Sequence, residues 1–384
     1  MQRQNYDLII VGGGMAGCIL AARIAENGVH PKTRERLNIA LLEAGPYFKG
    51  APSHGHGIPS RRRVFTNISH EFSENNRYSM PGGAMILGGS SMHYGAQAFP
   101  PFPADYDNWV SSTGVDWTKA NLQEAATEVR RVFNVHSDPE DSLSEGQKQF
   151  RATARSLGYP VRPLEGAKKN CIRCGFCNAA NMCKYDAKMS TLLTHVPDAE
   201  KYGVEIIPDT FVEKIIFDGR KATSVVCRQG DRETLIYGDN ILLSGGTNQT
   251  PLLLWKSGYG PADILGSNTV INNPNVGQHA HAHFGLFLRA LFPNPIKEGD
   301  RGWNAGTFII SDIKSNAQDR LLIQDSGMGG PESPDQVALS EFAPEFGRDH
   351  KTFMKSGAKR LGRTSIWIVP GELEGSLDQS GNIV

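Results

Sequence analysis

The N-terminal part of the chain alternates apolar runs with one glycine-rich turn. Residues 6–11, YDLIIV, are continuously apolar after the tyrosine–aspartate pair and predict a buried strand, which GGGMAG follows at once. The next segment, CILAARIAENG, predicts a helix whose small residues face inward. A second apolar run, NIALLEAG, predicts another strand and brings Glu43 to its end. The order of strand, turn, helix and strand predicts an α/β unit.

Later segments keep this mixed character. ANLQEAATEVRRVF predicts an amphipathic helix, and VEIIP, VEKIIF, TSVVCRQ and GDNILLS predict strands. After PNPIKEGD the pattern changes to short strands, AGTFII, RLLIQD and TSIWIV. We expect these to form a sheet that serves as the floor or wall of a substrate site.

Length and charge exclude several classes of protein. The 384 residues allow two domains or one large elaborated domain, and the 40 basic and 40 acidic side chains cancel. Nucleic-acid and anionic-membrane binders need a field of one sign, which this balance does not provide. No apolar run approaches the roughly 20 residues that cross a bilayer. The N-terminus lacks a charged-then-apolar leader. We therefore expect a cytoplasmic protein without a transmembrane segment.

The glycine-rich turn has the spacing of a dinucleotide-binding loop. Gly12, Gly14 and Gly17 follow a G-x-G-x-x-G pattern. The first glycine allows the tight turn, the second lets a pyrophosphate approach the backbone, and the third lets helix and strand pack closely. Glu43, at the end of the second strand, is placed to bind ribose hydroxyls. These residues predict a bound dinucleotide without saying which one.

Three further segments suggest which dinucleotide is bound. They are GGAMILGGSSMHYGAQAFPPFPADYDNW, SGGTNQTPLLLWKSGYG and NNPNVGQHAHAHF. Together with the N-terminal unit, they resemble the glucose–methanol–choline family of FAD-dependent oxidoreductases, in particular its pyranose oxidase and sugar dehydrogenase branch. The resemblance implies an α/β fold, with a Rossmann-like FAD-binding domain of the three-layer β/β/α type and an inserted α+β substrate domain. The FAD-binding domain would comprise residues 1–98 and 186–290, and the substrate domain residues 99–185 and 291–384.

The resemblance also implies which residues hold the cofactor. The ADP part of FAD would lie on Gly12, Gly14, Gly17 and Glu43, and the flavin end would lie along Gly89, Ser90, Tyr94 and Gly95. The backbone of Val212 would hold the adenine. Several relatives have asparagine in place of Tyr94. His93 falls where some relatives bond a histidine covalently to the flavin. The alternative is a histidine that packs against the flavin without a bond.

Four of the six cysteines are crowded together, in the spacing C-x2-C-x2-C-x5-C. Thiolates at Cys171, Cys174, Cys177 and Cys183 can hold an iron–sulfur cluster or zinc, and a loop of reduced thiols without metal is the third alternative. Cys18 and Cys227 stand alone and are expected to be small buried hydrophobes. The alternating histidines His279, His281 and His283 can bind a metal from one face of a strand, but the resemblance favours a structural role near the FAD.

The resemblance implies a catalytic histidine beside a second histidine or an asparagine, near the C-terminus of a full-length member. The last histidine of this chain is His350, within the expected substrate domain. We therefore expect the catalytic pair beyond Val384, in a missing segment or in a partner chain. Three hypotheses follow: an FAD-dependent oxidoreductase of a sugar, glycoside or alcohol that needs such a segment, a flavin-binding module without catalysis, and a nicotinamide-dependent enzyme.

Overall fold

The structure is a computed structural model. It describes residues 5–48, 70–72, 79–81, 84–92, 94–99, 103–115, 119–172, 183, 185–281, 284–291, 293–294, 307–312, 320–326, 347–357, 361–369 and 374–376. The chain divides into two compact units. The first unit contains residues 1–92, 190–281 and 374–384, and the second contains residues 93–189 and 282–373.

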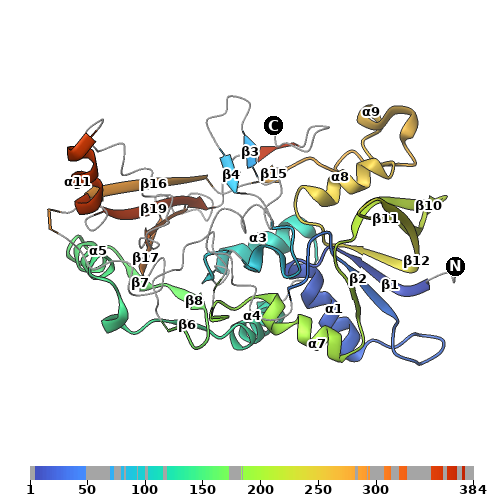
Figure 1. Ribbon diagram of the computed structural model, residues 1–384, viewed down its shortest axis with the longest axis horizontal. Coiled ribbons are helices and arrows are strands. Elements are labelled where there is room, and N and C mark those ends of the chain that lie inside the picture. The colour runs from blue at the N-terminus through green and yellow to red at the C-terminus, as the bar shows by residue number, and fades with distance from the viewer. Residues whose placement is uncertain are drawn as a thin grey trace. The chain divides into compact units, whose positions relative to one another are not determined.

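The first unit is built on a six-stranded sheet (Figure 1) with the order β10-β11-β12-β1-β2-β9. Strands β12, β1, β2 and β9 are parallel to one another, whereas β10, β11 and β12 form an antiparallel meander. The strands are β1 (Asn5–Val11), β2 (Ile39–Leu42), β9 (Glu205–Ile207), β10 (Phe211–Asp218), β11 (Lys221–Gln229) and β12 (Arg232–Leu243).

Strand β12 belongs to both parts of this sheet. Its first half, Arg232–Tyr237, pairs with β11, and its second half, Tyr237–Leu243, pairs with β1. No described strand pairs with residues 238–243 on the side opposite β1. Ile241, Leu242 and Leu243 are accordingly only partly buried, whereas Ile9 and Ile10 of β1 are fully buried. The second half of β12 therefore has an open edge among the described strands.

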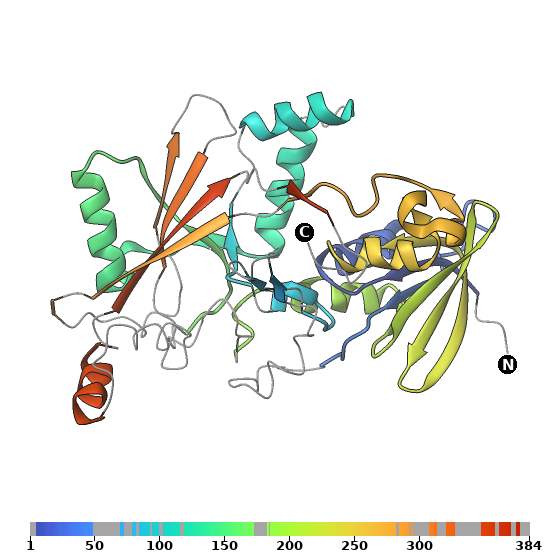
Figure 2. The ribbon, with the colours of Figure 1, turned by 90° about the horizontal axis from the view of Figure 1, so that it is seen from above.

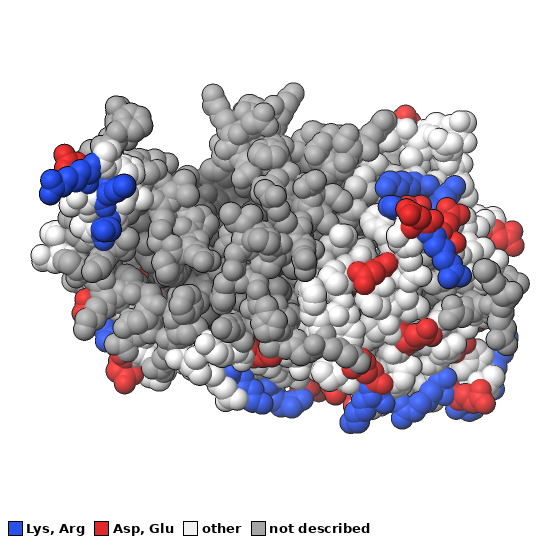
Figure 3. Space-filling view, viewed as in Figure 1, with Lys and Arg blue, Asp and Glu red and all other residues white. Residues whose placement is uncertain are grey.

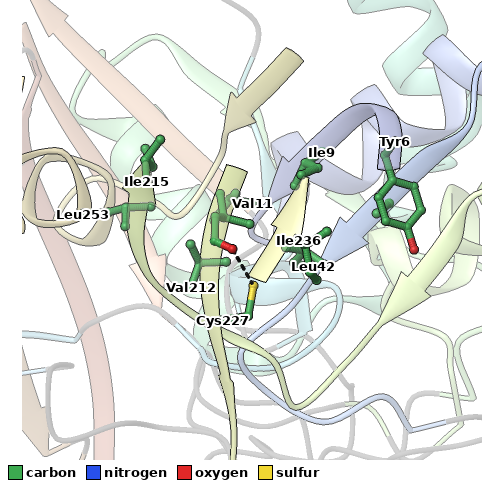
Figure 4. Close-up of a cluster of buried hydrophobic side chains, with 11 residues drawn as sticks. Tyr6, Ile9, Val11, Leu42, Val212, Ile215, Cys227, Ile236 and Leu253 are labelled. Carbon is green, nitrogen blue, oxygen red and sulfur yellow. Dashed lines mark hydrogen bonds between the residues drawn. The ribbon is translucent and has the colours of Figure 1, made fainter. Parts of the chain in front are cut away.

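Apolar side chains cover both faces of the parallel strands. On one face lies helix α1 (Met15–Asn27), whose small residues Cys18, Ala21, Ala22 and Ala25 are buried and let the helix approach the strands closely. On the other face the meander packs against β1 and β2, as the side chains in Figure 4 show. The resulting layers of helix, sheet and meander confirm the predicted three-layer α/β fold.

Shorter elements complete the first unit. The 3-10 helices are η2 (Gly89–Met92) and η4 (Gly266–Asn268), and the helices are α6 (Thr191–Thr194), α7 (Val196–Lys201), α8 (Gln249–Lys256) and α9 (Ala262–Leu265). The strand pairs are β3 (His70–Phe72) with β4 (Ser79–Pro81), β13 (Tyr259–Gly260) with β14 (Ile271–Asn272), and β15 (Ala280–His281) with β20 (Glu374–Gly375).

The sequence prediction placed all residues after 290 in the substrate domain. The structure corrects this for β20, because its antiparallel pairing with β15 returns it to the first unit.

The second unit contains an antiparallel five-stranded sheet with the order β16-β19-β18-β17-β7, and helix α5 lies along it (Figure 2). Its members are β7 (Val161–Pro163), β16 (Phe284–Leu291), β17 (Thr307–Asp312), β18 (Arg320–Ser326), β19 (Leu361–Val369) and α5 (Glu145–Ser156). The short strands predicted after PNPIKEGD are thus confirmed as strands of one sheet.

The rest of the second unit is a small sheet and further helices. The sheet has the order β5-β8-β6, formed by β5 (Gln97–Ala98), β6 (Val135–Ser137) and β8 (Glu165–Ala167). The helices are α3 (Pro103–Thr113), α4 (Lys119–Val132), η3 (Glu140–Ser142) and α11 (Gly347–Gly357). Helix α4 is the predicted amphipathic helix.

Two further observations concern the described helices and the distribution of charged side chains. Among the described helices, none has the length and apolar character needed to span a membrane. On the face shown in Figure 3, the described basic and acidic side chains lie in small mixed groups.

Candidate functional site

The carboxyl ends of the parallel strands meet at one edge of the sheet, where α/β proteins bind their ligands. Backbone hydrogen bonds tie these ends together. The N–H groups of Gly12 and Ser244 donate to Leu42 and Val11, each at 2.8 Å. The N–H of Thr210 donates to the carbonyl of Glu43 at 2.8 Å. The segments that follow β1, β2, β9 and β12 therefore share one small region.

The three glycines of the predicted motif differ in the space that a side chain would have. Gly12 has a φ of +101°, and a Cβ there would lie 2.5 Å from the carbonyl oxygen of Ser244. A Cβ on Gly17 would overlap the carbonyl oxygen of Gly12, so helix and strand can approach only without it. A Cβ on Gly14, in contrast, would meet no atom within 4 Å. The loop is thus tightly packed at its two ends and open in the middle, where a diphosphate needs access to the backbone.

Glu43 is buried at the end of β2, and its carboxylate is held by two backbone N–H groups. Oε2 accepts from Gly13 at 2.7 Å and Oε1 accepts from Gly45 at 2.8 Å. Burial raises the pKa of Glu43, and these two hydrogen bonds oppose the rise. Each carboxylate oxygen can accept more than one hydrogen bond. The carboxylate of Glu43 therefore has a fixed orientation and can still accept further hydrogen bonds.

The loop at Gly88 and Gly89 docks directly on the dinucleotide loop. The N–H of Gly88 donates to the carbonyl of Gly13 at 2.8 Å. Gly88 and Gly89 have φ angles of +95° and +53°, which favour glycine. A Cβ on Gly89 would lie 2.6 Å from the Cα of Gly14. The structure thus brings together Gly89 and Gly14, which the sequence predicted for opposite ends of one cofactor.

The two serines in this loop have different environments, and the flavin contact predicted for Ser90 stays a prediction. Ser90 is exposed, and its Oγ accepts a long 3.4 Å bond from the N–H of Ala84. Ser91 is buried, and its hydroxyl donates to the carbonyl of Gly88 at 2.6 Å. The N–H of Thr191 donates to the Ser91 hydroxyl at 3.1 Å. Ser91 and Thr191 therefore anchor the loop, and the paired serines in GGSSM were the only sequence signal for this.

Ser244 and two glycines were also missed. The Ser244 hydroxyl lies 3.0 Å from the carbonyl of Val11 and 2.8 Å from that of Gly12, so it clamps the end of β1. A Cβ on Gly13 would lie 2.6 Å from the side chain of Leu87, and one on Gly45 would overlap the backbone of Met85. The position of Ser244 directly before Gly245-Gly246 is a sequence signal that could have identified this serine. No neighbouring residue signals the contacts of Gly13 and Gly45, because their partners lie far away in the sequence.

The remaining predicted flavin-side residues belong to the second unit. The Tyr94 hydroxyl donates to the carbonyl of Met189 at 2.7 Å, and burial raises its pKa. Lys188 Nζ donates to the Tyr94 carbonyl at 2.8 Å and lies over its ring. A Cβ on Gly95 would make only ordinary contacts, the nearest with the side chain of Gln97 at 3.7 Å, so sterics do not require glycine there. His93 lies outside the described residues.

Val212 lies on β10, which is an edge strand of the described sheet. Its side chain is buried in the core between the meander and the parallel strands. The pairing register with β11 shifts between Val212 and Lys214, which marks a β-bulge. The contact of the Val212 backbone with adenine stays a prediction.

The cysteines fall into a buried and a partly exposed group. Cys18 and Cys227 are fully buried, as expected, and burial raises the pKa of each to about 12. Cys171 and Cys183 are partly exposed, and the Cys183 sulfur accepts N–H bonds from Tyr185 at 3.4 Å and Ala187 at 3.3 Å. Cys174 and Cys177 lie outside the described residues, so the predicted four-cysteine site stays a prediction.

The predicted histidine alternation is interrupted. His281 lies in β15, but His279 has a φ of +58° and is not part of a strand. His283 lies outside the described residues. His279 therefore does not share a strand face with His281. The structural role predicted for this segment stays a prediction.

The described residues contain one other group with metal-ligand chemistry. Atoms of Asp7, His30 and Asp239 lie within 4.8 Å of one another. The His30 Nδ1 atom accepts the N–H groups of Lys32 and Thr33, so the proton of a neutral imidazole is on Nε2 and faces Asp7. A metal-bound histidine usually donates through its second nitrogen. This geometry fits a His30 ring that faces Asp7 across 3.9 Å better than a metal site.

Comparison with known proteins now assigns the family. A model of the family described as GMC oxidoreductase matches residues 6–284. The chain is a member of the GMC oxidoreductase family. The family that the sequence resemblance predicted is therefore confirmed.

Individual GMC relatives are moderately similar. The chain is 30% identical over 315 residues to ecdysone oxidase from Bombyx mori, covering 73% of this chain and 45% of the relative. It is 24% identical over 322 residues to oxygen-dependent choline dehydrogenase from Staphylococcus saprophyticus, covering 77% and 55%. A crystal structure of pyridoxine 4-oxidase from Mesorbium loti matches the fold with a TM-score of 0.69 and 18% identity, covering 99% of this chain and 75% of that one. The chain thus spans about half the length of these curated relatives.

Proposed function

We propose that this GMC-family chain binds FAD and takes part in oxidising a CH–OH group of a sugar, glycoside or other alcohol. The observation that carries the proposal is the open space at Gly14, bounded by a loop whose other glycines are packed tightly. An unfilled position in the middle of a packed loop is what a closely bound diphosphate requires. Membership of a family of FAD-dependent enzymes favours FAD over a nicotinamide cofactor.

The residues fit the cofactor in a consistent order. The diphosphate would lie against Gly12 and Gly14, at the N-terminus of α1, where the free N–H groups and the helix dipole favour negative charge. Glu43 would accept from the ribose hydroxyls with its spare lone pairs. Val212 would hold the adenine through its backbone. Gly89, Ser90, Tyr94 and Gly95 would lie along the flavin end.

Bound FAD would supply a hydride acceptor, and the protein must remove the proton of the substrate hydroxyl. A positioned base for that proton is worth about a hundred- to ten-thousand-fold in rate. We nominate no base among the described residues. We propose that the catalytic pair comes from a segment that corresponds to the later part of the longer relatives, whether or not that segment is in a partner chain.

The open edge of β12 supports this part of the proposal. The backbone N–H and C=O groups on that side of residues 238–243 have no described strand partner, and the apolar side chains beside them are partly exposed. An unpaired edge within a sheet is a template for an added strand. A completing segment that contributes one parallel strand would pair this edge and bury those side chains. The alternative is a flavin-binding module without catalysis.

Two finer features of the cofactor chemistry remain part of the proposal. The first is that His93 contacts the flavin ring, either by packing against it or through a covalent bond, which would raise the flavin's potential as an electron acceptor. The second concerns Cys171, Cys174, Cys177 and Cys183, for which an iron–sulfur cluster, zinc and a loop of reduced thiols without metal are the alternatives. Neither is required for FAD binding. Acid precipitation followed by flavin fluorescence of the pellet tests the bond, and metal analysis of the purified protein tests the cluster.

Absorption spectroscopy of the purified chain, with and without added FAD, tests the proposal. We expect a flavin spectrum at a ratio of one FAD to one chain. The bound flavin should be reduced by an alcohol or sugar only when a polypeptide matching the later part of the relatives is supplied. Protein that binds NAD but not flavin contradicts the cofactor assignment. Reduction by a sugar at ordinary enzymatic rates without the added polypeptide contradicts the assignment of the catalytic pair.

A further inference from the structure

Two buried donor groups in the first unit have no hydrogen-bond partner among the described residues. They are the Ser190 hydroxyl and the side-chain amide nitrogen of Gln249, and a third such donor, the side-chain amide nitrogen of Gln147, belongs to the second unit. Folded proteins pair nearly all buried polar side-chain atoms, with protein, water or a ligand. A ligand bound to the first unit could therefore pair these two donors.

Ser190 adjoins the loop that docks on Gly14. It is only 2% exposed and occupies the cap position before α6, but its side chain makes no capping hydrogen bond. The next residue, Thr191, donates its N–H to Ser91 at 3.1 Å and its hydroxyl to the carbonyl of Gly88 at 3.3 Å. The turn that begins at Ser190 is thus packed on the Gly88–Met92 segment.

Gln249 adjoins the dinucleotide loop from another direction. It is the first residue of α8, and its Cβ lies 3.6 Å from the position that a Cβ on Gly245 would take. The Cα of Gly245 in turn lies 2.9 Å from the position of a Cβ on Gly12. Gln249 is therefore fixed beside the start of the same loop. Ser190 and Gln249 therefore adjoin segments that pack on Gly14 and Gly12, respectively.

We propose that the Ser190 hydroxyl and the Gln249 amide nitrogen are further FAD-binding groups, which donate hydrogen bonds to oxygen atoms of the dinucleotide. The diphosphate and its neighbouring hydroxyls present many acceptors and carry negative charge, which matches one O–H and one N–H₂ donor. This inference rests on the proposed function, because it assumes that FAD occupies the site. It adds two residues that lie outside the glycine motif.

The test compares FAD affinity with the stability of the FAD-free protein. The variants are Ser190→Ala and Gln249→Met, which remove the donors, and Gln249→Glu, which replaces a donor by a negative charge. Ser142→Ala is the matched control, because Ser142 is equally buried but its hydroxyl already donates to Pro139 at 2.6 Å in the second unit. FAD affinity is measured by flavin fluorescence titration, and stability by urea unfolding without FAD.

We expect Ser190→Ala and Gln249→Met each to weaken FAD binding about tenfold, since hydrogen bonds to charged groups are among the stronger ones. Gln249→Glu should weaken it further. The unfolding midpoint of the FAD-free protein should stay unchanged or rise for the first two, because an unpaired donor has been removed. Ser142→Ala should lower that midpoint and leave FAD affinity unchanged.

Equal FAD affinity in wild type, Ser190→Ala and Gln249→Met would overturn the inference, and would assign these donors to bound water. A loss of affinity that is matched by a lower unfolding midpoint without FAD would also overturn it, because the groups would then support the fold. A wild-type chain that binds no FAD at all refutes the proposed function itself. These outcomes separate the failure of the inference from that of the function on which it rests.

Discussion

Gly89 and Gly14 are in close contact, but only one of them is sterically confined. A methyl group built on Gly89 would lie 2.6 Å from the Cα of Gly14, whereas one built on Gly14 would meet no atom within 4 Å. The contact fixes the flavin-side loop against the dinucleotide loop. The free side of Gly14 leaves room for a ligand. Fold and function therefore place different demands on these two glycines.

Gly89→Ala should destabilise the protein even without cofactor. The φ of +53° costs an L-residue roughly 1 kcal/mol, and the close approach to Gly14 adds to that cost. We expect the free energy of unfolding to fall by about 2 kcal/mol or more in urea titrations. Gly95→Ala is the control, since its nearest neighbour would be 3.7 Å away. Equal stability of the two variants would show that the Gly89–Gly14 contact is unimportant for folding.

Glu43 should make the stability of the FAD-free protein depend on pH. Burial raises the pKa of its carboxyl above the ordinary 4.5, so folding favours the protonated form. The resulting stabilisation is fully present below pH 4.5 and is lost as the pH rises through the folded value. Glu43→Gln removes this titration. Wild type should therefore lose stability relative to Glu43→Gln as the pH rises from 4.5. A wild type that instead gains stability relative to Glu43→Gln over this range would contradict the raised pKa.

The buried thiols should be inert in the folded protein. With a pKa of about 12, Cys18 and Cys227 are thiolates at pH 8 in only about one part in ten thousand. Iodoacetamide labelling, mapped by mass spectrometry, should modify the partly exposed Cys171 and Cys183 at least roughly a hundredfold faster. In guanidinium chloride all four should react alike. Rapid labelling of Cys18 under native conditions would mean that α1 does not pack as described.

Hydrogen exchange should reveal the open edge of β12. Successive N–H groups of a strand point to opposite edges, and β1 is paired on both sides along Leu8–Val11. All amides there should be protected. Between Gly238 and Leu243, alternate amides should exchange at least about a hundredfold faster, because only the β1 side is paired. A completing polypeptide should slow them. Uniform protection of β12 in the isolated chain would contradict an open edge.

The sequence predicted those parts of the fold and site that depend on neighbouring residues. YDLIIV, the glycines and NIALLEAG specify a strand, a turn, a helix and a strand within one short segment, so neighbouring residues alone single out Gly12, Gly14, Gly17 and Glu43. The structure gives each of them a distinct environment at the sheet edge. Their contacts with FAD remain predictions.

Long-range contacts could not be predicted in this way. Gly45 must be glycine because the backbone of Met85 lies against it, and Ser244 clamps Val11 although 233 positions separate them in the chain. Strand β20 returns to the first unit through its pairing with β15. Local periodicity carries no information about such partners. The anchoring role of Ser91 also depends on a distant residue, because the N–H of Thr191 donates to its hydroxyl.

FAD titration of wild type and Gly14→Val tests the account most directly. Gly14 has an extended backbone with φ −76° and ψ −164°, which valine adopts readily, and the space beside it is open. The variant should therefore unfold at the same urea concentration as wild type. Its added side chain would occupy the diphosphate position, so FAD should bind at least about a hundredfold more weakly. A stably folded Gly14→Val protein that binds FAD as tightly as wild type would contradict the assignment of this loop as the cofactor site.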